Sequence, residues 1–201
     1  MRPQIIEKLV RIFTQFPGIG PRQAVRFAYY LVGAKIEIRT ELRDALEGLK
    51  RVKRCGLCDR AHEGSGEACA FCGDGTRDRH MLAVIEKDVD LESIEKAGIY
   101  RGRYFILGGL LSALNIQSKS RARLERLFEY VKASPHIREV ILMMSTTVEG
   151  SFTARYVEKI LEPLKKNRTL SITHLAQGLS AGAELEYLNR DTLKSALENR
   201  R

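Results

Sequence analysis

The sequence predicts a multidomain chain that combines an all-helical N-terminal part with an α/β part, joined by a small cysteine-rich segment and closed by a short C-terminal segment. Three observations lead to this fold class. Apolar residues recur at helical spacing in the first 54 residues, all four cysteines fall within eighteen residues, and short apolar strands alternate with helical patterns after them. We expect four parts, at 1–54, 55–78, 79–175 and 176–201.

The N-terminal part is expected to contain three helices. Apolar spacing marks them at about 3–16, 21–32 and 40–53. The run PGIGPR interrupts the first helix, and Pro21 takes the first position of the second, where a missing N–H does no harm. This part is therefore an α-helical domain with a tight turn between its first two helices.

The turn and its flanking helices, residues 16–27, have the helix-hairpin-helix pattern that proteins use on DNA backbones. The glycines let the main chain approach a phosphate, and the N–H groups that open the second helix supply donors. Arg22 and Arg26 lie four residues apart and project from one helix face. An ordinary turn between helices is the alternative interpretation. The expected DNA-contacting residues are Lys8, Arg11, Gly18, Gly20, Arg22 and Arg26.

The cysteines form two identical pairs, Cys55-x-x-Cys58 and Cys69-x-x-Cys72, with ten residues between them. Each pair directs two sulfurs at one centre, so two pairs supply the four thiolates of a closed tetrahedral zinc site. A redox pair needs only one such motif and leaves the second unexplained. His62 lies between the pairs as a possible substitute ligand. A site with four protein ligands has no position for water, so we expect the zinc to be structural.

The α/β part is expected to form a parallel sheet wrapped by helices. Continuous apolar runs predict strands at 80–86, 104–108, 139–144 and 170–175, and helical patterns separate them at 88–97, 119–133 and 150–166. A short helix is expected near the C-terminal end of the printed sequence. The boundary between the helical and the α/β parts falls at the cysteines.

Acidic residues follow the first and third strands of this sheet. Glu86 ends the first strand and Glu149 follows the third, at the strand ends where α/β folds bind ligands. A magnesium site for phosphoryl transfer needs carboxylates from both ends. The third strand offers only Glu149 among hydroxyls, and Asp88 and Asp90 are also explained as acids that favour the start of a helix. The sequence has no GxxxxGK[ST] phosphate loop either, so we expect no catalytic site.

Composition and charge narrow the class of protein further. Hydrophobic residues make up 44% of the chain, no apolar run approaches the roughly 20 residues that span a bilayer, and no signal peptide is present, so we expect a soluble, cytoplasmic protein with no membrane partner. The formal net charge is +9, and residues 1–54 alone carry twelve Lys and Arg against five Asp and Glu. Such a concentration favours docking of a polyanion, although a basic surface kept for solubility has the same composition.

In the order of its parts the chain resembles the bacterial recombination mediator proteins of the RecR family. The resemblance rests on FPGIGP (16–21), the two cysteine pairs, YRGRYFILGGLLS (100–112), TVEG (147–150) and GAELEYLNRDTL (182–193). It implies a helix-hairpin-helix domain, a zinc knuckle, a Toprim domain and a C-terminal segment that helps to close an oligomer. Ser145 and Thr146 stand where the family commonly has Asn-Pro, which weakens a Toprim metal site further.

The resemblance also implies a function and partners. It implies a dimer or tetrameric ring that clamps single-stranded, gapped or duplex DNA at the nucleoid and acts with RecO and RecF to load RecA, without being an enzyme. It assigns Arg22 and Arg26 to DNA contact, the four cysteines to zinc, and Glu86 and Glu149 to contact with RecO. A magnesium-dependent Toprim nuclease or primase and a protein-binding scaffold are the alternatives.

Overall fold

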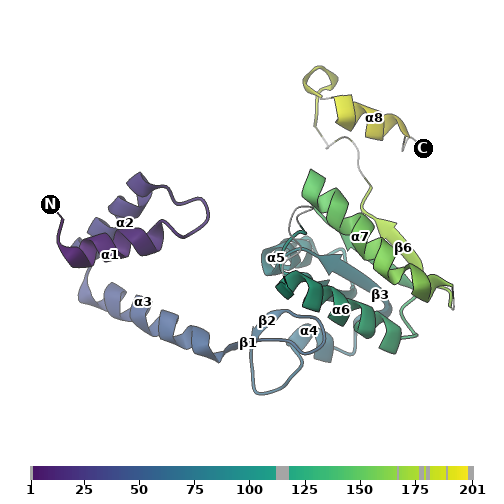
Figure 1. The fold of residues 1–201 in the computed structure, drawn as a ribbon, viewed down its shortest axis with the longest axis horizontal. Helices are drawn as coiled ribbons and strands as arrows, with labels where there is room; N and C mark the ends of the chain where they lie inside the picture. Colours follow the sequence, from purple (N-terminus) through teal and green to yellow (C-terminus); the bar gives the residue numbers. More distant parts are fainter. Residues whose placement is uncertain are drawn as a thin grey trace. The chain divides into compact units, whose positions relative to one another are not determined.

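The computed structural model describes residues 2–111, 118–166, 168–176, 179, 182–188 and 190–198 (Figure 1). They form two compact units, residues 1–52 and 53–201. The finer division into four parts stays a prediction. Among the residues described, no helix combines the length and the apolar character that crossing a membrane requires.

The first unit consists of three helices and a short 3₁₀ turn. They are α1 (Gln4–Phe13), α2 (Pro21–Gly33), α3 (Ile36–Gly48) and η1 (Leu49–Arg51). α1 packs on α2, and the Phe13 ring lies 5.9 Å from the rings of Phe16 and Phe27. The predicted start of the third helix at residue 40 is wrong by four residues. The first turn of α3 carries no buried apolar residue, so periodicity could not mark it.

The second unit begins with the cysteine-rich segment, continues through a parallel sheet with its helices and ends with a short helix. Its elements are β1 (Val52–Arg54, which crosses the unit boundary), β2 (Ala61–Glu63), α4 (Ala70–Gly73), β3 (Asp78–Ile85), α5 (Asp88–Ala97), β4 (Gly102–Ile106), α6 (Ser118–Ala133), β5 (Glu139–Met143), α7 (Val148–Lys165), β6 (Ser171–His174), η2 (Leu185–Tyr187) and α8 (Arg190–Glu198). β1 pairs with β2 beside the cysteines, and the remaining strands form a sheet in the order β4-β3-β5-β6. Every pairing in that sheet is parallel, as predicted.

Helices cover both faces of the four-stranded sheet (Figure 1). Successive side chains of a strand point to opposite faces, so Leu82 and Val84 pack against α6 and α7, whereas Ala83 and Ile85 pack against α5. Phe105 and Tyr104 of β4 divide in the same way. The predicted fold class, a helical N-terminal part followed by a cysteine cluster and a helix-flanked parallel sheet, is confirmed.

Candidate functional site

The two cysteine pairs meet at one point. The Sγ atoms of Cys55, Cys58, Cys69 and Cys72 all lie within 4.8 Å of one another, and Cys55, Cys58 and Cys69 are buried. The β1–β2 hairpin supplies the first pair, and the start of α4 supplies the second. His62, the predicted substitute ligand, is not part of this group.

The spacing of these sulfur atoms fits a tetrahedral metal centre. A zinc ion with Zn–S bonds of about 2.3 Å places neighbouring sulfurs about 3.8 Å apart. Here the Sγ atoms of Cys55 and Cys72 lie 3.8 Å apart, and those of Cys58 and Cys69 lie 3.5 Å apart. The Cys69 N–H also donates to the Cys55 Sγ at 3.3 Å, a contact that stabilises a thiolate. The four residues can therefore hold one metal ion.

The proximity of the thiols perturbs their titration. The hydrogen bond with Cys69 and burial raise the pKa of the Cys58 thiol far above its usual range, and the same hydrogen bond lowers the pKa of Cys69. Four adjacent thiolates repel one another in a buried site. A divalent cation offsets that repulsion with its positive charge, and its binding releases the thiol protons.

A buried carboxylate next to the second cysteine fixes this segment to the α/β body. Asp59 is 2% exposed, its φ of 62° lies in the left-handed region, and its oxygens form ion pairs with Arg123 at 2.7 Å and Arg126 at 2.5 Å. Arg126 also donates to the carbonyl oxygens of Cys55 and Gly56, at 3.2 and 3.1 Å. Both arginines come from α6, so this helix holds the first cysteine turn directly.

Two further contacts tie the cysteine segment to the sheet. The Ile106 N–H, at the end of β4, donates to the Cys58 carbonyl oxygen at 2.8 Å. The Asp88 carboxylate, in the first turn of α5, accepts from Arg54 at 2.7 Å and from the Ala61 N–H at 2.8 Å. The segment is thus held by α5, β4 and α6 together, and it belongs to the same compact unit as the sheet.

The residues expected to contact DNA lie on the surface of the first unit. Gly18 has φ +80°, a conformation that favours glycine, and Gly20 is the N-cap of α2. Arg22 and Arg26 follow in α2, and Lys8 and Arg11 lie on α1. All six are exposed. None of the four cations forms an ion pair with a described residue, so each charge faces solvent.

The two acidic residues at the strand ends differ in environment. Glu86 is 7% exposed, and its Oε1 accepts from the Ser145 N–H at 2.5 Å, which fastens the loop after β5 to the end of β3. Glu149 is exposed in the first turn of α7. A Cβ on Gly150 would meet the Ser145 carbonyl oxygen at 2.0 Å, so that loop crosses close to the helix. The structure gives Glu86 a positioning role and leaves Glu149 on the surface.

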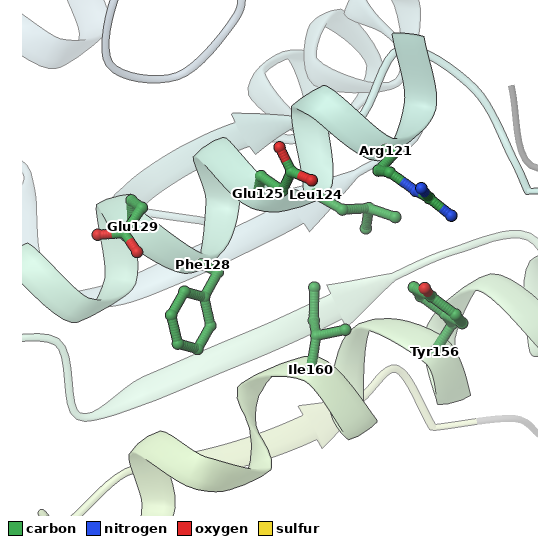
Figure 2. Close-up of a pocket in the computed structure, with 7 residues that line it drawn as sticks. All are labelled: Arg121, Leu124, Glu125, Phe128, Glu129, Tyr156 and Ile160. Carbon is green, nitrogen blue, oxygen red and sulfur yellow. The ribbon is translucent and has the colours of Figure 1, made fainter. Parts of the chain in front are cut away.

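A groove of about 420 Å³ lies between α6 and α7 (Figure 2). Leu124 and Phe128 of α6 face Tyr156 and Ile160 of α7 across it. Charged side chains of α6 border it, namely Arg121, Glu125 and Glu129. None of the residues predicted to form a site lines this groove.

Comparison with known families matches three consecutive parts of the chain. Residues 6–49 match the description "RecR, helix-hairpin-helix", residues 81–176 match "Toprim domain", and residues 178–201 match "RecR, C-terminal". A "Recombination protein RecR" from Thermus thermophilus is 43% identical over 199 residues, 99% of this chain and 97% of that protein. The chain belongs to the RecR family.

Other relatives of the same name support this assignment. The RecR protein of Phenylobacterium zucineum is 38% identical and that of Pelotomaculum thermopropionicum 37% identical, each over 98% of this chain and over 95% and 94% of its own length. The sheet flanked by α5, α6 and α7 is thus the Toprim domain of a RecR protein, and the predicted family is confirmed.

Sequence reasoning missed the ion pairs between Asp59 and α6. Asp59 follows directly on a metal-ligand motif, and two arginines three residues apart lie on one face of the predicted helix 119–133. These are weak signals by themselves, because a charge next to a turn is common on any protein surface. Only the fold shows that Asp59 is buried.

Proposed function

We propose that this chain is a non-enzymatic recombination mediator that binds DNA as a ring-forming clamp in recombinational repair. In this proposal it acts with RecO and RecF to help load RecA onto gapped or single-stranded DNA at the nucleoid. Membership of the RecR family carries the proposal. The four parts predicted from the sequence would serve as DNA-binding domain, zinc knuckle, Toprim body and oligomer-closing segment.

DNA contact is proposed for the hairpin of the first unit. The exposed cations Lys8, Arg11, Arg22 and Arg26 flank a glycine turn that opens into the N-terminus of α2. Main-chain N–H groups and guanidinium groups at such a turn suit phosphate oxygens rather than base edges. Binding is therefore expected to tolerate any sequence and to weaken as salt rises.

Self-association is proposed because the first unit exposes many large apolar side chains. Its buried residues are Ile6, Ala24, Ala28 and Gly48. Exposed apolar side chains line all three helices, namely Ile5, Ile12, Phe27, Tyr29, Tyr30, Val32, Ile36, Ile38, Leu42 and Leu46. Apolar side chains exposed in such number on one small unit favour an interface. Several hairpins on one ring would then add their weak phosphate contacts.

The strand ends of the Toprim domain are proposed to contact RecO. Glu149 is exposed there, and Glu86 holds the neighbouring Ser145 loop in place. Glu149→Lys is expected to weaken RecO binding by reversing the charge, and Glu86→Gln to weaken it less, through the loop. Calorimetry of each variant with RecO measures this. Wild-type affinity in both variants would exclude the strand ends from the RecO interface.

A magnesium-dependent nuclease or primase is the competing proposal. Against it, the Glu86 carboxylate is buried and already accepts the Ser145 N–H. A nicking and primer-synthesis assay with Mg²⁺ or Mn²⁺ decides between the two. Product formed by the wild type and lost in Glu86→Gln would establish the enzyme.

Zinc is the metal proposed for the four cysteines, in a structural role. The sulfur spacing and the all-thiolate donor set suit Zn²⁺ in a closed tetrahedral site. Elemental analysis of protein purified without added metal is expected to show one zinc per chain. Iron in its place would instead indicate a rubredoxin-like centre of the same geometry.

The central test of the clamp combines DNA affinity with molecular mass. Arg22→Ala/Arg26→Ala is expected to weaken binding of a gapped duplex and to flatten the dependence of affinity on salt. Arg39→Ala/Arg43→Ala, on α3 of the same unit, removes the same charge and serves as the control. Light scattering with and without the duplex measures the oligomer. A monomer under all conditions would overturn the clamp, and little DNA affinity even at low salt would favour the scaffold.

A further inference from the structure

A second set of basic residues lies at the opposite edge of the Toprim sheet from Glu86 and Glu149. The strands of a parallel sheet all start at one edge, and here the segments that lead into them are basic. The Arg138 N–H donates to the His80 carbonyl oxygen at 2.8 Å, and the Ser171 N–H donates to the Arg138 carbonyl oxygen at 2.8 Å. These bonds hold the start of β5 between the starts of β3 and β6, with neighbouring strands about 4.8 Å apart.

Successive side chains of a strand point to opposite faces of the sheet, so charged residues at this edge lie on one face or the other. Arg103 of β4 points to the same face as Phe105, toward α6 and α7. Glu139 of β5 points to the other face and accepts from Thr173 at 2.8 Å. Arg138, two residues before Val140, lies on the α6–α7 side with Arg103. Arg79 belongs to the stretch 78–82, where the register of β3 is irregular, and its charge acts on His136. We call the basic residues at these strand starts the strand-start surface, namely Arg79, His80, Arg103, His136, Arg138 and Arg168.

The titration of His136 supports the convergence of these cations. Partial burial, and after it the charges of Arg103, His80, Arg79 and Arg168, lower the pKa of His136 below its usual value. Groups exert such an effect only when they lie near one another. His136 therefore lies near several basic residues.

Part of the strand-start surface is held rigidly and part is free to bind. Arg168 donates to the carbonyl oxygens of Ser134 and Val131 at 3.0 and 2.8 Å, at the end of α6. Arg79 and Arg138 are exposed and take part in no ion pair with any described residue. Two exposed guanidinium groups thus stand beside Arg168, which main-chain carbonyl oxygens hold in place.

We propose that the strand-start surface is a second DNA-contacting site, which binds the phosphodiester backbone separately from the hairpin of the first unit. This second site rests on the proposed function as a DNA-binding protein, and it adds a DNA contact on the Toprim domain. Guanidinium groups match phosphate oxygens with paired hydrogen bonds, and the rigid sheet edge sets their spacing. Such contacts position the backbone without reading sequence.

The test removes the two free arginines and leaves the supporting ones. Arg79→Ala/Arg138→Ala deletes two charges from the strand-start surface without breaking a described ion pair. Arg155→Ala/Lys159→Ala, exposed on α7, deletes the same charge elsewhere and serves as the control. Affinity for a short oligothymidine is measured by fluorescence anisotropy across a salt series, in the full-length protein, with Arg22→Ala/Arg26→Ala run in parallel.

We expect Arg79→Ala/Arg138→Ala to weaken binding about fivefold at low salt and to reduce the slope of log affinity against log salt by about 1.4, since each phosphate contact to a single strand contributes about 0.7. The control should change the slope by less than half as much. Nuclear magnetic resonance should show the pKa of His136 rising when oligothymidine is added, because phosphates offset the surrounding cations. That rise should be smaller in Arg79→Ala/Arg138→Ala.

The outcomes separate the two proposals. A slope reduced in Arg22→Ala/Arg26→Ala but unchanged in Arg79→Ala/Arg138→Ala overturns the second site and leaves the hairpin. No oligothymidine binding by the wild type, even at low salt, removes DNA binding altogether and this site with it. An acidic polyglutamate peptide is the competing probe. If it binds the strand-start surface as tightly as oligothymidine does, the surface is a docking site for acidic protein segments and the proposal is overturned.

Discussion

The carboxylate of Asp59 and the guanidinium of Arg126 form an ion pair of 2.5 Å across 67 positions of the sequence. Asp59 follows the first cysteine pair, and Arg126 lies in α6 of the Toprim domain. Arg126 also donates hydrogen bonds to two carbonyl oxygens of the cysteine turn. One side chain therefore connects the candidate metal centre to the domain that carries it.

The Asp59 contact is expected to stabilise both the fold and the metal site. Asp59→Asn should lower the free energy of unfolding by about 2 kcal/mol, because two arginines lose a buried partner while the left-handed backbone remains acceptable to Asn. It should also speed metal loss to a coloured chelator. Urea unfolding and the rate of metal release measure the two effects. Asp74→Asn, a half-buried carboxylate of the same segment that contacts Thr76 and Arg77 rather than α6, is the control, and equal behaviour of the two variants would contradict the prediction.

Removal of the metal is expected to destabilise the second unit more than the first. Without a cation the four thiols lose their common centre, and the segment between β1 and α4 has few apolar side chains with which to pack. Chelation, or Cys69→Ser, should lower the thermal midpoint and speed proteolysis within residues 55–78. Mass spectrometry of the fragments locates the cuts. A metal-free protein with an unchanged midpoint would show that the site adds nothing to stability.

Gly150 is expected to be essential for the close approach of the loop after β5 to α7. Gly150→Ala would place a Cβ 2.0 Å from the Ser145 carbonyl oxygen, so the loop must move away from Glu86. We expect a loss of about 2 kcal/mol in unfolding free energy, although alanine normally favours a helix. Ser151→Ala, the next and exposed position of α7, should be neutral or slightly stabilising. Thermal unfolding compares them, and a stabilised Gly150→Ala would refute the close approach.

Stability is expected to fall in acid partly through Glu95. Burial opposes its ionisation, but hydrogen bonds from Arg77 and Tyr104 outweigh burial and lower the pKa of Glu95 below its ordinary value of 4.5. A lowered pKa adds stability above pH 4.5, and that stability is lost as the pH falls through the folded-state pKa. Glu95→Gln should therefore be less stable than the wild type at pH 7, by about 1 kcal/mol, and the difference should be smaller at pH 3. Urea unfolding at both pH values measures this. A constant difference at both would exclude the linkage.

The local elements of the fold were predictable because their signals lie within a few residues. Buried strands read as continuous apolar runs, and predicted helices such as 88–97 coincide with observed ones. The predicted start of α3 was wrong because its first turn has no local signal of this kind. Ile36 and Ile38 are both exposed, so they do not follow the spacing of a buried helix face. The meeting of the two cysteine pairs was also predictable, because four thiols at such spacing have few other uses.

By itself, then, the sequence determined the order of the parts, the cysteine cluster and the glycine turn with its arginines, because each depends on spacing along one short segment. Only the tertiary structure decided that Asp59 is buried against α6, that Glu86 accepts the Ser145 N–H, and that the strand-start residues lie at one edge of the sheet. The physical reason is the crossover topology of a parallel sheet. Strands adjacent in space are separated in sequence by whole helices, so the side chains they bring together carry no shared local pattern.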